Sequence, residues 1–119
     1  MISWATIGYG GALSGLAAAG LTYAATRRAA LTALAVLAAV AGPVGWNAVL
    51  RATHASEFFT DAPIAVLPAS WQDTGSGIAT FAVAATLLGL GPLRRNGRRT
   101  IATASLAGLA AFLVDVYLY

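Results

Sequence analysis

Charged residues in this chain occur only at the edges of four long stretches that contain no Asp, Glu, Lys or Arg. The stretches cover residues 1–26, 29–50, 74–93 and 100–114. About 20 apolar residues wound as a helix cross the roughly 30 Å hydrocarbon layer of a bilayer, where lipid cannot hydrogen-bond a bare backbone. The pattern therefore predicts an all-α membrane protein.

The predicted architecture is a four-transmembrane-helix bundle that forms a single domain over residues 1–119. The helices are expected at about 3–26, 29–50, 77–93 and 100–119, with a longer, ordered outer loop at 51–76. Six of the seven arginines lie in the two short connections, and short arginine-rich loops stay in the cytoplasm. The bundle is therefore expected to be N-out/C-out. The Trp and Tyr residues that map to the outer interface agree with this orientation: Trp4, Trp46, Trp71, Tyr117 and Tyr119.

Composition limits the function classes. With 59% hydrophobic and 9% charged residues in 119, four helices leave no room for a soluble domain. The pI near 10 would suggest nucleic acid in a soluble protein, but every arginine lies beside a predicted span. The basic balance is better explained by topology and anionic lipid headgroups, so we expect the lipid bilayer as a partner and no nucleic acid. The absence of cysteine excludes disulfides and thiolate chemistry, and we expect no cofactor.

Small residues at helical spacing predict how the helices pack. At about 100° per residue, Gly8, Gly11 and Gly15 share one face of the first helix, and Gly11 with Gly15 forms a GxxxG pair. Ala104 and Gly108 share the inward face of the fourth helix. The same projection groups the small residues of the third helix inward: Ala82, Ala85, Thr86 and Gly89. The glycine face of the first helix is broader than one neighbour usually requires, which leaves two alternatives: ordinary packing within the chain, or contact of part of this face with another subunit.

Nearly all the remaining polar side chains map to the outer side: Asn47, Arg51, His54, Glu57, Asp61, Gln72, Asp73 and Asp115. Six of them form a candidate cluster. Its members are Arg51, His54, Glu57, Asp61, Asp73 and Asp115. If the second helix continues past the membrane surface, the residues on one arc of it are Asn47, Arg51, His54, Glu57 and Asp61. Asp115 is expected to point into the bundle.

The sequence allows two interpretations of this cluster. His54, Glu57 and Asp61 could bind a divalent metal through N and O ligands or carry a proton. Alternatively, Arg51 pairs with Asp115 or Glu57, and His54 is only an interfacial residue.

The outer loop combines apolar residues with a helix start. Its apolar run at 58–67 could cover another protein. The sequence Ser70-Trp71-Gln72-Asp73 resembles a capping box, which predicts a helical turn that begins after Ser70.

No motif in the chain identifies a reaction, and no ionisable residue lies near the centre of a predicted span. We therefore expect a non-catalytic accessory or scaffolding subunit of a larger complex in the cell membrane. It would bind other subunits, or itself, through its small-residue helix faces and outer loop. Two alternatives remain: a small homo-oligomeric transporter or channel for an ion or small solute, and a membrane-surface metal-binding protein.

Overall fold

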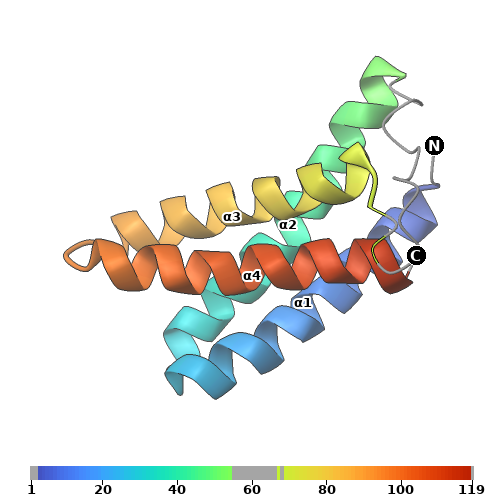
Figure 1. Cartoon of the computed structure of the whole chain (residues 1–119). Coiled ribbons are helices and arrows are strands. Elements are labelled where there is room, and N and C mark those ends of the chain that lie inside the picture. The colour runs from blue at the N-terminus through green and yellow to red at the C-terminus, as the bar shows by residue number, and fades with distance from the viewer. Residues whose placement is uncertain (1–2, 55–66, 68, 119) are drawn as a thin grey trace.

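The computed structural model describes residues 3–54, 67 and 69–118. Within these residues the chain forms four helices: α1 Trp4–Thr26, α2 Ala29–Thr53, α3 Trp71–Leu90 and α4 Gly97–Leu118. Consecutive helices run antiparallel, so both arginine-rich turns lie at one end of the bundle and the terminal ends of α1 and α4 lie at the other (Figure 1). The all-helical prediction is confirmed.

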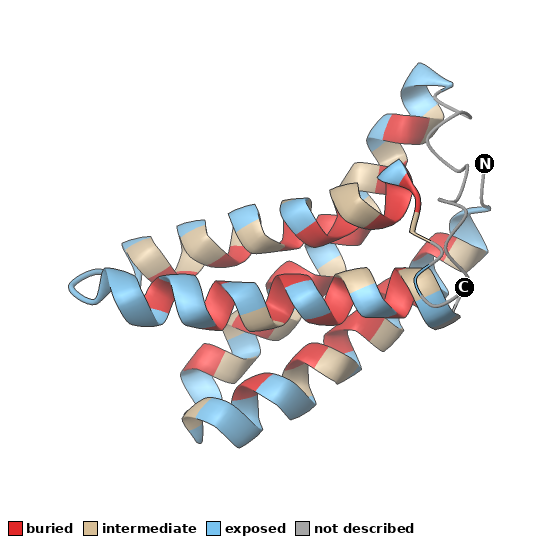
Figure 2. Ribbon diagram, in the orientation of Figure 1, coloured by how far each residue is buried: buried red, intermediate tan, exposed pale blue. Residues whose placement is uncertain are grey.

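Each helix packs against its neighbours in sequence, and α1 also packs against α4, which closes the bundle. Buried residues follow the inward faces of all four helices (Figure 2). The longest dimension of the described residues is 40 Å, close to the roughly 40 to 45 Å thickness of a bilayer with its headgroups.

Three of the four helices are long and apolar enough to cross a membrane: α2, α3 and α4. This composition indicates a membrane protein. α1 carries no charge but is not among the three, and its 23 residues include five glycines and four Ser or Thr. The fourth span therefore stays a prediction.

The helix boundaries differ from the predicted ones by three or more residues at four places: both ends of α3, the end of α2 and the start of α4. α3 ends at Leu90 instead of residue 93, because the Leu93 N–H bonds back to the Leu88 carbonyl in the turn that follows. α2 continues past residue 50 to Thr53, whose hydroxyl donates to the Val49 carbonyl at 2.9 Å. α4 begins at Gly97 instead of residue 100, where the Asn96 side chain accepts from the Arg99 N–H at 3.1 Å. Polar side chains at these ends bond to the helix backbone, so the helices extend beyond the uncharged stretches.

The start of α3 is the largest correction, because it lies at Trp71, within the segment assigned to the outer loop. Ser70 Oγ accepts from the Asp73 N–H at 3.2 Å, and Asp73 Oδ2 accepts from the Ser70 N–H at 2.8 Å. This is the predicted capping box, and it is confirmed. The rest of the predicted loop, apart from Leu67 and Ala69, lies outside the described residues.

Glycines bring the helix backbones close together at two crossings. A Cβ built on Gly42 of α2 would lie 2.5 Å from Thr80 Oγ1 and 2.6 Å from Thr80 Cα of α3. A Cβ on Gly108 of α4 would lie 2.9 Å from the Gly77 carbonyl oxygen of α3. The acyl chains of lipid are as apolar as the side chains of a membrane helix, so the hydrophobic effect does not drive one helix against another. Close van der Waals contact holds membrane helices together instead.

The predicted packing positions are largely buried between helices. Gly11 and Gly15 face the valines of α2, since a Cβ on Gly15 would lie 2.9 Å from Val40 Cγ2, and Ala104 and Gly108 are buried. Gly8 is exposed, with no atom of another helix within 4 Å of a Cβ built on it.

The inward face predicted for the third helix is wrong, because Ala82 and Thr86 are exposed. Its buried face is instead lined by Gly77, Thr80, Ala84 and Leu88. The contacts of Thr80 with Gly42 and of Gly77 with Gly108 determine which side of α3 faces the other helices. The size of a side chain alone does not predict that side, because the large Leu88 is also buried on it.

We predict that Gly42→Ala lowers the free energy of unfolding by about 1 to 3 kcal/mol, because the new methyl group would meet the backbone of Thr80. Gly45→Ala is the matched control on the same helix, since its Cβ would meet no atom within 4 Å. The control should leave stability unchanged or raise it by up to about 1 kcal/mol through helix propensity. Equilibrium unfolding in detergent measures both, and equal effects would contradict the packing described for Gly42.

Candidate functional site

A buried polar network joins three helices at the end of the bundle away from the two arginine turns. Gln72 of α3 lies at its centre. Its Nε2 donates to Asn47 Oδ1 of α2 at 3.0 Å and to Asp115 Oδ2 of α4 at 3.0 Å. Asn47, Gln72 and Asp115 are each at most 5% exposed. One amide group therefore connects α2, α3 and α4 inside the protein.

The local sequence positions each member. Asn47 lies one turn after Pro43, and its Nδ2 donates to the Pro43 carbonyl at 2.8 Å, which leaves Oδ1 to face α3. Gln72 lies in the first turn of α3, where the capping box fixes the helix start. Its backbone carbonyl accepts from Trp46 Nε1 at 3.1 Å, and the Trp46 ring lies against Gly75, where a Cβ would collide with it.

The arrangement is suited to holding helices together. The Gln72 amide has two hydrogens and meets two acceptors at 3.0 Å, with Ser76 Oγ a weaker third at 3.5 Å. A buried polar group that loses its partner costs free energy, so the network fixes the relative positions of the three helices.

Of the predicted cluster, Asp73 and Asp115 are buried. The inward orientation predicted for Asp115 is confirmed, and its carboxylate accepts from Gln72. The Arg51 guanidinium lies 5.0 Å from the centre of the Trp4 ring, which connects the end of α2 to the start of α1. Its predicted pairing with Asp115 or Glu57 stays a prediction.

The predicted polar arc required the second helix to continue through His54, and it does not. α2 ends at Thr53, and the exposed His54 takes a left-handed conformation with φ 55°, where its N–H donates to the Arg51 carbonyl at 3.4 Å. This closes the helix, so His54 does not continue the helical spacing that includes the buried Asn47. Glu57 and Asp61 lie outside the described residues.

A metal site is not assembled by the part of the chain that the structure describes, where no group of three His, Asp or Glu side chains could hold an ion. Two of the three predicted ligands, Glu57 and Asp61, lie outside that part. The metal-binding alternative therefore stays a prediction.

The sequence places Gln72 on the outer side but not in the predicted cluster, because an uncharged amide in an expected loop gives no signal of burial. The signal that could have found it is spacing: once the capping box starts a helix at Ser70, Gln72, Ser76 and Thr80 follow one another at four-residue intervals on one face.

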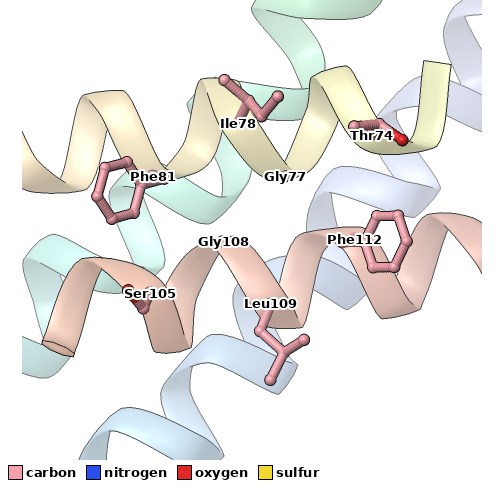
Figure 3. A pocket seen from close by; sticks show the side chains of 8 residues that line it. All are labelled: Thr74, Gly77, Ile78, Phe81, Ser105, Gly108, Leu109 and Phe112. Atoms are coloured by element: carbon pink, nitrogen blue, oxygen red, sulfur yellow. The ribbon is translucent and has the colours of Figure 1, made fainter. Parts of the chain in front are cut away.

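An apolar depression of about 360 Å³ lies on the surface of the bundle, where α3 crosses α4. Figure 3 shows Phe81 of α3 and Phe112 of α4 on either side of the Gly77–Gly108 contact, with Ile78 and Leu109 further out. Its lining includes no charged side chain, and its only hydroxyls are those of Thr74 and Ser105. It can accept an apolar chain but offers no group for acid, base or nucleophilic chemistry.

No family model, no curated protein and no solved structure matches this chain.

We predict that Gln72→Met lowers the free energy of unfolding by about 1 to 2 kcal/mol, because it removes the donor shared by Asn47 and Asp115 while keeping similar volume. Thr86→Val is the control on the same helix, since the exposed Thr86 hydroxyl donates only to the Ala82 carbonyl of its own helix. The control should change stability by less than about 0.5 kcal/mol. If the two substitutions had the same effect on unfolding in detergent, the network would not be what joins the helices.

Proposed function

We propose that this protein is a non-catalytic accessory subunit of a larger membrane complex and that it docks on its partner through the outward face of α1. This face carries the small residues Ala5, Gly8, Ala12 and Gly20 together with Tyr9, Leu16 and Tyr23, all exposed. The observation that carries the proposal is that, within the described residues, only part of the glycine surface of α1 packs against another helix. Gly11 and Gly15 meet α2, whereas Gly8 and Gly20 have open space beside them.

The composition of α1 supports the same proposal. α2, α3 and α4 are long and apolar enough to cross a membrane, and α1, which is uncharged but rich in glycine, is not among these three. A glycine-rich face offers few side-chain atoms to lipid and allows another helix to approach its backbone closely. Contact with a second protein would therefore stabilise α1 in the membrane more than contact with lipid does.

The proposal includes an orientation of the bundle in the membrane. The two arginine turns share one end of the bundle, so the positive-inside rule places that end in the cytoplasm and both termini outside. Trp4 and Trp71 begin α1 and α3 and Tyr117 lies near the end of α4, all at the opposite end, where aromatic side chains would meet the outer headgroups. The chain would then be a multi-pass protein of the cell membrane.

The proposal predicts that Ala12→Cys, labelled with a photoreactive maleimide in native membranes, cross-links to a second protein of defined mass. The chain has no native cysteine, so the label reports on one position only. Leu109→Cys is the matched control, because Leu109 is exposed like Ala12 but belongs to α4, which does not carry the proposed face. The control should yield no protein adduct.

Adding Gly8→Leu to the labelled chain should reduce the adduct at least tenfold, because the leucine would prevent close approach of a partner helix, whereas a Cβ at this position meets no described atom of its own chain within 4 Å. The absence of any adduct from Ala12→Cys would contradict the proposal. An adduct between two copies of this chain would instead favour the homo-oligomeric transporter or channel.

A further inference from the structure

We propose that the turn between α3 and α4 binds the phosphate group of an anionic phospholipid. The turn contains a hollow of about 440 Å³ lined by Gly91, Pro92, Arg94 and Arg95. It begins where α3 ends at Leu90, so in a bilayer it would lie at the level of the headgroups. The inference does not depend on the docking of α1.

The backbone of the turn is fixed from within the protein. Leu93 is buried in the core formed by α2, α3 and α4, and its N–H donates to the Leu88 carbonyl at 2.9 Å. The Leu93 carbonyl in turn accepts from Thr100 Oγ1 at 3.2 Å and from the Asn96 N–H at 2.9 Å. The two arginines that follow are therefore presented from a rigid base, which lowers the entropy cost of binding.

Gly91 provides the space for the hollow. A Cβ on this residue would lie 2.7 Å from the Leu87 carbonyl oxygen, so no other residue fits without moving the backbone. The absence of a side chain leaves the hollow open beside Arg94 and Arg95.

The charge around the hollow is uncompensated. Arg94, Arg95, Arg98 and Arg99 are all exposed, and none forms an ion pair with another residue that the structure describes. The two described carboxylates, Asp73 and Asp115, lie near the opposite ends of α3 and α4. Four guanidinium groups so close in sequence repel one another, and an anion between them would relieve this repulsion.

A phosphate ester is the anion that fits best, because the planar guanidinium group binds phosphate oxygens through two parallel hydrogen bonds. Leu90 favours a lipid over a free phosphate as its source. This residue precedes Gly91 directly and is 79% exposed, so an acyl chain attached to the bound headgroup would cover its side chain.

The test uses the whole chain in nanodiscs, with phosphatidylglycerol as the anionic probe and phosphatidylcholine as the neutral one. Native mass spectrometry should show that phosphatidylglycerol is retained at least tenfold more than phosphatidylcholine. The double variant Arg94→Gln/Arg95→Gln should lose this preference. The control Arg27→Gln/Arg28→Gln removes the same charge from the other turn and should change the preference less than twofold. Circular dichroism of each variant checks that the helices remain.

Three results would overturn the proposal. The wild-type chain could show no preference between the two lipids, and this result does not depend on whether any variant folds. Both double variants could lose the preference equally, which would indicate general surface charge and no site. Finally, millimolar inorganic phosphate could displace all the phosphatidylglycerol, which would assign the site to free phosphate and remove the role of the lipid.

Discussion

The bundle depends on the close approach of helix backbones at positions that lack a side chain. Gly42 of α2 lies against the backbone of Thr80, and Gly77 of α3 lies against Gly108 of α4. In lipid the hydrophobic effect does not drive one helix against another, so the attraction comes from van der Waals contact, which falls off steeply with distance. The Gln72 amide can reach α2 and α4 at once because the crossings bring these helices close to α3.

The two ends of the bundle use polar residues in opposite ways. At the end of the Gln72 network, polar side chains turn inward and bond to one another across three helices. At the other end, six arginines are exposed, and within the described residues the one contact of their guanidinium groups is that of Arg27 with the Tyr23 ring, at 5.9 Å. Inward bonding fixes the helices relative to one another, whereas outward charge is suited to the anionic surface of a membrane.

α1 differs from the other three helices in how it uses its surface. Its inward face packs on the valines of α2 and on α4, and Ala18 meets Ala39 and Ala110. Its outward face keeps Gly8 and Gly20, which no described part of the chain covers. An uncharged helix that packs inward through glycine and alanine and keeps further small residues on its outward face is suited to lie between two protein surfaces.

The sequence by itself determined the helical class, the antiparallel order and the positions of the two basic turns, because charge marks where a chain leaves lipid and local caps such as Ser70 and Asp73 act within four residues. It also determined the inward orientation of Asp115. Only the tertiary structure decided which face of α3 is buried, that His54 ends α2, and that Asn47, Gln72 and Asp115 meet. These features depend on the angles at which the helices cross. The side chains of two helices together determine a crossing angle, and the periodicity of one segment holds no information about the second helix.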